Sequence, residues 1–574
     1  MPAAKRSLFN TAGCLTPAVS FLAAALGEVR KKKRWNGMLG RLLFSGCLLL
    51  SLVACSLSQQ APSRTVSAAE QLVLAEQRGQ LVLHWPEQRS ERVAVNNKRR
   101  FLAYAGQGEL LIDLQQTQEL QLRLNQQLLT LTATAQQQRI DISKLTRNGE
   151  NRLELVSIKP ANAQVQISIP YPTLRSDLTS YATAFSAVDQ LIEQEIRQGF
   201  PGAVLVVVKN GVIIKHSAYG YAERYQADGT LLSQPRLMQT DTLFDIASNS
   251  KMYATNYALM RLVSEGKLDV TKPVQHYLPE YQGDGREQRT VSDLLYHTAG
   301  YAPEVHFFRP DNRHGPQFYS LNKADTEQLI LTQVPFATER GTAAVYSDVD
   351  YMLLGMLIER LSGQPLDQYL RQQFYQPLGL FRTLFNPLQH GFTRDQNAAT
   401  ELDGNSRGGR VSFPANRSGV IVGEVHDEKA FYSFQGVAGH AGLFSTAEEL
   451  AVLMALSLQG GGYGWQQFFT PATLAQFKAP SPYDHRFGLG WRTAVQGDLN
   501  WHFGAYASDS AYGHTGWTGT ATVIDPEQQL LVVLLTNKKH SPIVAEGESY
   551  YFSGDRFETG RYGSILTLIY QALP

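Results

Sequence analysis

The chain has 574 residues, of which 43% are hydrophobic and 18% charged, a composition typical of a globular protein with several domains. Its 52 Lys and Arg residues are balanced by 51 Asp and Glu residues, so the formal net charge is +1. A nucleic-acid binder would carry a basic excess, and we therefore expect no nucleic-acid partner. The three cysteines, Cys14, Cys47 and Cys55, lie near the N-terminus, which excludes a disulfide framework and a cysteine-based metal site from the rest of the chain.

An apolar stretch over residues 42–54 follows Arg41 and ends in Leu52-Val53-Ala54-Cys55. It is shorter than the roughly 20 residues that a helix needs to cross a bilayer. A charged start, a short apolar core and small residues before a cleavage point indicate a secretory signal. Because the ending resembles a bacterial lipobox, we expect cleavage before Cys55, lipid attachment to its thiol, and a membrane-anchored lipoprotein of the bacterial periplasm. The alternatives are an uncleaved anchor and a cysteine that stands there by chance.

Residues 1–54 form this predicted signal region, but the first 37 residues precede an ordinary signal that begins at Met38. Met38 is therefore a second candidate start site. Residues 55–66 are rich in Ser and Gln, and we interpret them as a tether.

Residues 67–172 alternate apolar and polar side chains in short runs, most clearly at 80–84, 120–124 and 165–169. Period two with turn residues between the runs predicts an antiparallel β-sandwich. The segment around Gly149, a residue suited to a turn that other residues resist, resembles the signature of jelly-roll domains similar to galactose-binding modules. The alternative is a spacer without a ligand.

After a predicted linker at residues 173–181, the pattern changes. Residues 182–198 have the apolar spacing of a helix, residues 202–208 form a buried strand, and Asn210-Gly211 is typical of a hairpin turn. Helical patterns dominate the middle, and strands return at 521–524 and 530–537. Strands at both ends predict an α+β domain over residues 182–574, with an antiparallel sheet that joins both ends and is flanked by helices.

The strongest chemical signal is Ser248-x-x-Lys251, which follows a short apolar strand and opens an apolar helix over residues 252–265. Residues three apart share one face of a helix, and the helix N-terminus favours developing negative charge. Desolvation can lower the pKa of a lysine, which would then act as a base for the serine. The same motif recurs at Ser264, near a helix end, and at Ser320, in a polar loop, so we single out Ser248.

Two further motifs follow in order: Tyr346-Ser347-Asp348 before an apolar helix, and His514-Thr515-Gly516 before Trp517 and a strand. With Ser248-x-x-Lys251 they resemble the Ser-x-x-Lys, Tyr-x-Asn and Lys-Thr-Gly motifs of the serine β-lactamase and penicillin-binding protein superfamily, in its class C β-lactamase-like branch. The phrases at residues 294–300, 425–430 and 436–446 are similar to further phrases of this branch.

The resemblance implies a β-lactamase/transpeptidase-like fold with a helical subdomain, and a serine hydrolase without cofactor or metal. Ser248 would accept the acyl group, and Lys251 and Tyr346 would share its proton, with Tyr346 as base or leaving-group acid. The implied substrate-binding residues are Asp348, His514, Thr515, Gly516 and Trp517, with the backbone N–H groups of Ser248 and Trp517 as an oxyanion hole. The implied function is that of a D-Ala-D-Ala carboxypeptidase-like penicillin-binding protein, with a peptidoglycan stem peptide as substrate and a β-lactam as covalent inhibitor.

Two residues depart from the family pattern: Asp348 stands in place of Asn, and His514 in place of Lys. The motif residues then carry a charge of about 0 instead of about +2, and each change is worth roughly 3 kcal/mol at about 5 Å and an effective dielectric near 20. We expect a weaker hold on anionic substrates, and we expect His514 to gain charge as the pH falls towards about 6. Arg309 or Arg313 is a candidate for the missing positive charge.

The departures leave three alternatives: an esterase or amidase of the same scaffold, a weak β-lactamase, or a non-catalytic envelope binding protein. His426-Asp427-Glu428 has metal-capable side chains, but adjacent loop residues rarely face one ion, and we predict a structural loop. We expect His297 to hydrogen-bond its own turn.

Overall fold

The computed structural model describes residues 81–84, 97–160, 163–547 and 549–573, all within one compact unit. The predicted signal region, the lipobox with Cys55 and the tether lie outside these ranges. No helix within the described ranges is both long enough and apolar enough to span a bilayer.

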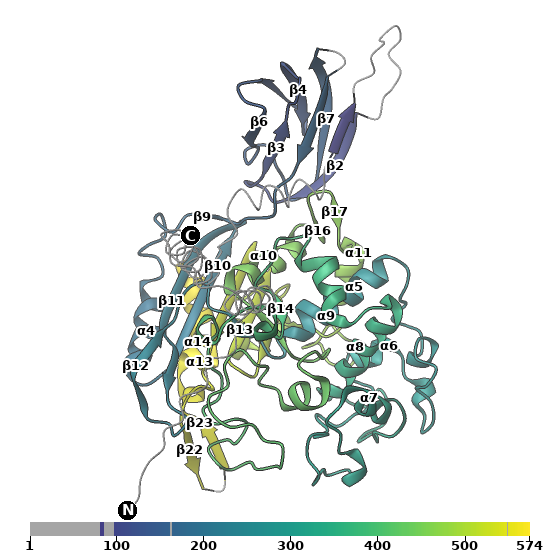
Figure 1. Cartoon of the computed structure of the whole chain (residues 1–574), viewed down its shortest axis with the longest axis vertical. Helices are drawn as coiled ribbons and strands as arrows, with labels where there is room; N and C mark the ends of the chain where they lie inside the picture. The colour runs from purple at the N-terminus through teal and green to yellow at the C-terminus, as the bar shows by residue number, and fades with distance from the viewer. Residues whose placement is uncertain (1–80, 85–96, 161–162, 548, 574) are drawn as a thin grey trace, which may run out of the picture. The chain divides into compact units, whose positions relative to one another are not determined.

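Residues 81–168 form two four-stranded antiparallel sheets, with strand orders β1-β8-β3-β6 and β2-β7-β4-β5 (Figure 1). In β4 the alternate residues Leu120, Leu122 and Leu124 are buried in a core of their own, which confirms the predicted β-sandwich. Gly149, at φ 79°, opens β7 as the turn pattern predicts. The strands are β1 (Leu81–His84), β2 (Lys98–Ala103), β3 (Glu109–Asp113), β4 (Glu119–Leu124), β5 (Gln127–Thr132), β6 (Gln137–Asp141), β7 (Gly149–Lys159) and β8 (Gln164–Ser168).

The second part of the fold is built on a larger sheet with the order β12-β11-β10-β21-β20-β19-β18, and β9 (Arg175–Ser176) pairs with β11. Strand β10 pairs antiparallel with β21, so the sheet joins both ends of the domain as predicted. The turn at Asn210 and Gly211 has φ of 49° and 75°, as a tight hairpin requires. The strands are β10 (Gly202–Lys209), β11 (Val212–Tyr225), β12 (Leu231–Leu237), β18 (Arg492–Thr493), β19 (Tyr512–Gly516), β20 (Thr520–Asp525) and β21 (Leu530–Thr536).

This sheet is covered on both faces, which explains the continuous apolar run of β10. Val204, Val206 and Val208 face one core, and the alternating Ala203, Leu205 and Val207 face the other. The second core is closed by α4 (Ser186–Arg197) and α14 (Gly563–Ala572), which lie along the sheet in Figure 1. The first core contains the helical region with α5 (Tyr257–Ser264), α6 (Val291–Leu295), α7 (Lys323–Thr332), α8 (Asp348–Ser362) and α10 (Ala447–Leu458). The predicted α+β class is confirmed.

The segment after Ser248 differs from the single α-helix that the sequence predicts. A π-helical segment, η1 (Lys251–Asn256), precedes α5. Its side chains are tied to the surrounding core: Thr255 Oγ1 donates to Gly439 O at 2.6 Å, and Asn256 Oδ1 accepts from Tyr351 Oη at 2.9 Å. Such wide turns are rare and occur often at functional sites.

Candidate active site

Ser248 lies at a sharp turn between β13 (Phe244–Asp245) and the helix that carries Lys251. The residue before it, Ala247, has a φ of 48°, a left-handed conformation that is unfavourable for a side chain with a Cβ. Ala247 N donates to Asp245 Oδ1 at 2.8 Å, which holds the turn. The turn leaves Ser248 half-buried, while Ala247 and Asn249 are buried. The serine hydroxyl therefore has partial access to solvent at a fixed backbone position.

The turn between β19 and β20 is fixed against the same segment. Thr518 Oγ1 donates to Asp245 O at 2.8 Å, and Thr520 Oγ1 donates to Ile246 O at 3.0 Å. A Cβ on Gly516 would lie only 2.4 Å from Ile246 O, so this close approach of backbones requires glycine. The structure thus brings the predicted His514-Thr515-Gly516 motif and Trp517 beside the Ser248 turn.

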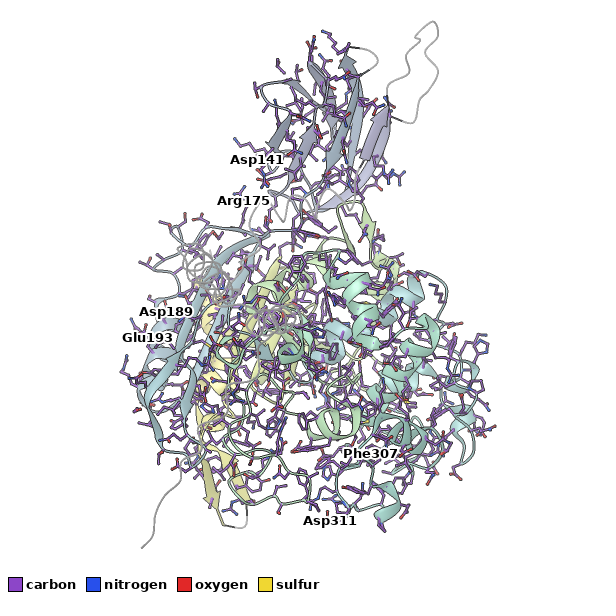
Figure 2. All side chains as sticks on the ribbon, viewed as in Figure 1. Asp141, Arg175, Asp189, Glu193, Phe307 and Asp311 are labelled. Atoms are coloured by element: carbon purple, nitrogen blue, oxygen red, sulfur yellow. The ribbon has the colours of Figure 1, made fainter. Side chains whose placement is uncertain are left out.

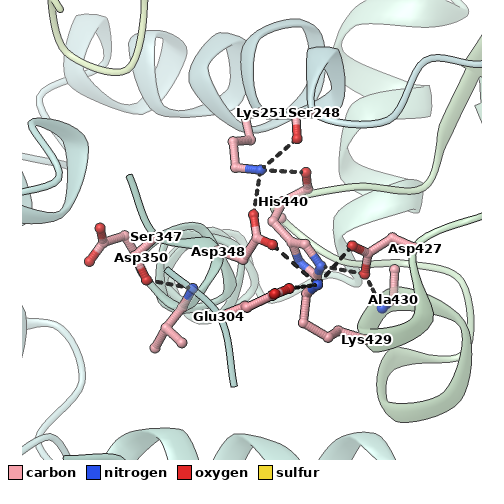
Figure 3. A network of polar contacts seen from close by, with 12 residues as sticks. Ser248, Lys251, Glu304, Ser347, Asp348, Asp350, Asp427, Lys429, Ala430 and His440 are labelled. Atoms are coloured by element: carbon pink, nitrogen blue, oxygen red, sulfur yellow. Dashed lines mark hydrogen bonds and ion pairs between the residues drawn. The ribbon is translucent and has the colours of Figure 1, made fainter. Parts of the chain in front are cut away.

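Lys251 is fully buried, and three polar contacts meet at its ammonium in Figure 3. Its ammonium donates to Ser248 Oγ at 3.1 Å, to Asp348 Oδ1 at 2.8 Å and to His440 O at 3.0 Å. Burial lowers the pKa of Lys251, but the neighbouring Asp348 and Tyr346 outweigh it, and the pKa is raised above its usual value. The expectation of a lowered lysine pKa is therefore wrong. Lys251 is a cation that supports the serine oxygen.

Tyr346 lies next to this cation. Its ring centroid is 5.0 Å from Lys251 Nζ and 4.7 Å from the ring centroid of His297. Its hydroxyl is buried and has no hydrogen-bond partner among the described residues. A positioned phenol without a committed partner is able to relay a proton, accepting one on its oxygen as it donates its own.

Asp348 is the first residue of α8, and Ser347 caps this helix by accepting from Val349 N. The two carboxylate oxygens of Asp348 face two lysines. Lys251 Nζ lies 2.8 Å from Oδ1, and Lys429 Nζ lies 3.3 Å from Oδ2. Burial raises the pKa of Asp348, but the two ammonium groups prevail and hold it at about 2. Asp348 is therefore ionised at neutral pH.

Lys429 was not identified from the sequence as a site residue, although it lies in one of the phrases that resemble the family. Its ammonium also lies 3.1 Å from Asp427 Oδ2 and 3.3 Å from Glu304 Oε2. His440 Nε2 lies 2.9 Å from Asp427 Oδ1. Glu304 lies 125 residues before Lys429 in the sequence, so spacing alone could not bring these two residues together.

Three groups in this cluster have the chemistry of metal ligands. The ligand atoms of Asp348, Asp427 and His440 lie within 4.8 Å of one another. The ammonium of Lys429 lies 3.3 Å and 3.1 Å from the two carboxylates and supplies the positive charge there, so we assign no metal site.

The other predicted metal-capable residues diverge, as a structural loop would. His426 Nε2 lies 2.7 Å from Glu401 Oε2, and Glu428 bonds Arg407. His297 does not hydrogen-bond its own turn through its ring, contrary to expectation. Its Nδ1 lies 2.8 Å from Asp350 Oδ2, because the helix α8 packs directly against it.

His514 differs from its predicted behaviour. It is 2% exposed, and its Nδ1 lies 2.7 Å from Thr515 O. Burial and the nearby Arg492 and Lys251 hold its pKa well below the usual value, so the expectation that it gains charge near pH 6 is wrong. Thr515 is half-buried.

Trp517 is 43% exposed, but its ring contacts the side chains of neighbouring residues. It stacks on His426 with centroids 4.5 Å apart, and Lys539 Nζ lies 4.2 Å from its centroid. The backbone N–H groups of Trp517 and Ser248 donate to no backbone or side-chain acceptor within the described part of the chain. They are therefore available to an oxyanion.

A positive charge beside these motifs comes from Arg492 of β18, which the sequence did not indicate. Arg492 pairs with Gly513, the residue before His514, and its guanidinium carbon lies 5.6 Å from the ring centroid of Tyr346. It is half-buried and makes no ion pair within the described ranges. Arg309 is not the replacement, because it pairs with Asp311 at 2.6 Å; Asp311 is labelled in Figure 2.

The model of the Beta-lactamase family matches residues 188–553. The N-acetylmuramyl-L-alanine amidase of Bacillus subtilis strain 168 is 50% identical over 393 residues, which cover 67% of this chain and 88% of that protein. An Escherichia coli K12 protein named as a D-alanyl-D-alanine carboxypeptidase is 43% identical over 394 residues, which cover 67% of this chain and 90% of that protein. The solved structure of EstCE1, a hydrolase with promiscuous acyltransferase activity, has a TM-score of 0.50 at 22% identity. The match covers 67% of this chain and 99% of that one, and it shows a similar fold alone.

Proposed function

The chain belongs to the beta-lactamase family and is a serine hydrolase, and we propose that it cleaves an amide bond of the peptidoglycan stem peptide through an acyl-enzyme on Ser248. Family membership confirms the resemblance inferred from the three motifs. The observation that carries the proposal is the contact of 3.1 Å between the buried Lys251 ammonium and the half-buried Ser248 Oγ, beside an uncommitted tyrosine hydroxyl.

The proposed reaction is acyl transfer in two steps. Ser248 Oγ attacks the amide carbonyl carbon while its proton passes to Tyr346 Oη, and the hydroxyl proton of Tyr346 passes to the leaving amine nitrogen, so the C–N bond breaks and the phenol is neutral before and after the step. The Lys251 ammonium stabilises negative charge on the serine oxygen, and the free N–H groups of Ser248 and Trp517 stabilise the oxyanion. Water then hydrolyses the ester, with the same groups acting in reverse.

Arg492 favours a substrate with a carboxylate close to the scissile bond. A half-buried guanidinium without a carboxylate partner in the described ranges is suited to a bidentate bond with such a group. The terminal carboxylate of D-Ala-D-Ala meets this description, as does the carboxylate of a β-lactam inhibitor. A D-Ala-D-Ala carboxypeptidase activity is therefore our first candidate, and the name of the Escherichia coli relative agrees with it.

A second candidate is cleavage between N-acetylmuramic acid and L-Ala. It is favoured by the 50% identity to the Bacillus subtilis amidase. The acyl group on Ser248 would then be the lactyl group of the sugar, and the peptide would leave through its N-terminal amine. The peptide's own carboxylates would be available to Arg492.

One experiment separates the candidates. The protein is incubated with an N-acetylmuramyl pentapeptide, and the products are identified by mass spectrometry. Loss of one alanine supports the carboxypeptidase, and separation of the sugar from an intact pentapeptide supports the amidase. No product, or equal product from Ser248→Ala, contradicts the proposal.

We also propose that the protein is a lipoprotein anchored to a membrane and facing the bacterial periplasm. The support is the sequence Leu52-Val53-Ala54-Cys55 after an apolar core. Metabolic labelling with an alkyne fatty acid should mark the wild type and not Cys55→Ser, and a label that persists in Cys55→Ser contradicts the anchor.

A further inference from the structure

Lys429 is a buried lysine enclosed by carboxylates. Its side chain is 4% exposed, and its ammonium lies 3.1 Å from Asp427, 3.3 Å from Asp348 and 3.3 Å from Glu304 (Figure 3). These contacts raise its pKa well above the usual value despite burial, which lowers it. A buried ammonium is retained only where such partners offset its desolvation.

The carboxylates come from separate segments that meet at the site. Asp348 begins α8, and its backbone N–H donates to Pro303 O at 3.0 Å, which brings the neighbouring Glu304 to the cluster. Lys429 begins η8 (Lys429–Ser433), where Ala430 N also donates to Asp427 Oδ1 at 2.8 Å. The cluster is therefore fixed by backbone contacts as well as by charge.

Asp348 divides its two oxygens between the lysines. Oδ1 faces Lys251, which bonds Ser248, and Oδ2 faces Lys429. Within the cluster, the two ammonium groups of Lys251 and Lys429 face three carboxylates, those of Asp348, Asp427 and Glu304, so these five side chains carry a net charge of −1. If Lys429 were neutral, Lys251 would be the remaining ammonium for these carboxylates, and their attraction would draw it away from Ser248 Oγ. If Asp348 were an amide, its single oxygen could accept from only one of the two lysines, and its NH₂ group would meet the ammonium of the other.

We propose that Lys429 is a positioning residue for acyl transfer, and that it acts through Asp348 to hold the Lys251 ammonium against Ser248. The inference rests on the proposed role of Ser248 as nucleophile. It implies that acyl transfer does not require the charge of Asp348 or of Lys429 as such, but requires that the two side chains match each other. A neutral amide and a neutral side chain together should serve in place of the ion pair.

The test is a double-mutant cycle with Lys429→Met, Asp348→Asn and the double variant. The readouts are the rate of labelling by a fluorophosphonate probe, and kcat and KM for p-nitrophenyl acetate. Each single substitution should slow labelling about 10-fold or more, and the double variant should label faster than either single variant. The loss should fall on kcat and leave KM within about 2-fold, because Lys429 does not face the substrate.

A matched control is Lys323→Met, which removes the lysine paired with Glu359 at 2.7 Å near the other end of α8. It should label within about 2-fold of the wild type. Additive losses in the double variant, or an unchanged rate in Lys429→Met, would overturn the proposal. If a single variant fails to fold, a folded double variant that labels supports the pair, and a folded double variant that does not label overturns it.

The probe and the ester carry no peptidoglycan group, so the cycle is independent of the substrate proposed above. Labelling that persists in Ser248→Ala overturns both proposals. Coupling between the two positions, without turnover of the muramyl pentapeptide, overturns only the proposed substrate.

Discussion

The ammonium of Lys251 and the carboxylate of Asp348 form an ion pair of 2.8 Å in which the lysine is fully buried. This pair raises the pKa of Lys251 although burial lowers it, so the lysine beside Ser248 is not the neutral base that desolvation alone would produce. The proton of Ser248 must therefore pass to another group, and Tyr346 is the neighbour with an uncommitted hydroxyl.

Arg492 should determine the preference for substrates with a carboxylate. Replacement of Arg492 by Met removes the charge beside Tyr346, and we expect KM for a D-Ala-D-Ala peptide to rise about 10-fold or more. KM for the same peptide with a C-terminal amide in place of the carboxylate should change little. Arg486→Met is the matched control, because Arg486 already pairs with Asp484 at 2.7 Å. An equal loss for both substrates would show that Arg492 does not bind the carboxylate.

His514 should not act as a switch near neutral pH. Because its pKa lies well below the usual value, the ring stays uncharged between pH 6 and 8, and the ratio of rates for anionic and neutral substrates should owe nothing to it. His514→Gln should give the same pH dependence of this ratio as the wild type, measured with matched acid and amide peptides. A rise of the ratio towards pH 6 in the wild type alone would contradict the assignment.

Asp348 should stabilise the fold in a way that acid removes. Burial raises its pKa, but Lys251 and Lys429 lower it from 3.8 to about 2. A lowered carboxyl pKa contributes stability above pH 3.8, and this contribution is lost as the pH falls through 2. It amounts to about 2 kcal/mol. The free energy of unfolding of the wild type and of Asp348→Asn should be measured with urea between about pH 5 and 2. As the pH falls, the wild type should lose about this amount of stability relative to the variant. A constant difference would refute the lowered pKa.

Gly516 should tolerate no side chain. A Cβ there would lie 2.4 Å from Ile246 O and 2.2 Å from Thr520 Oγ1, so Gly516→Ala must push β19 away from the Ser248 turn. We expect loss of turnover and about 1–3 kcal/mol of stability, measured by ester hydrolysis and urea unfolding. Gly391→Ala, at φ 88° in open space, adds a strained backbone conformation without a clash and away from the site, and it should keep its turnover. A fully active Gly516→Ala would contradict the packing.

Features that depend on neighbouring residues could be predicted from the sequence. The alternation in β4, the Asn210-Gly211 turn and the order of the three motifs are all local patterns, and the structure places Ser248, Lys251 and Tyr346 together. The sheet that joins both ends of the domain followed from strands at each end.

The electrostatics of the site could not be predicted, because they arise from contacts between distant segments. Lys251 meets Asp348, which lies 97 residues further along the chain, and Lys429 meets Asp348 from another loop. Arg492 reaches the site through the pairing of β18 with β19, and β18 is only two residues long. The π-helical η1 depends on tertiary contacts of its buried side chains, which no local propensity encodes.

Acyl transfer at Ser248 is tested most directly by mass spectrometry of the protein after incubation with a penicillin, followed by peptide mapping. We predict one penicilloyl adduct on the peptide that contains Ser248, in the wild type and in Ser264→Ala and Ser320→Ala. Those two serines serve the fold, because Ser264 Oγ donates to Met260 O at 2.8 Å and Ser320 Oγ donates to Asn322 O at 3.0 Å. An adduct that persists in Ser248→Ala, or that maps to another residue of the wild type, would contradict the assignment.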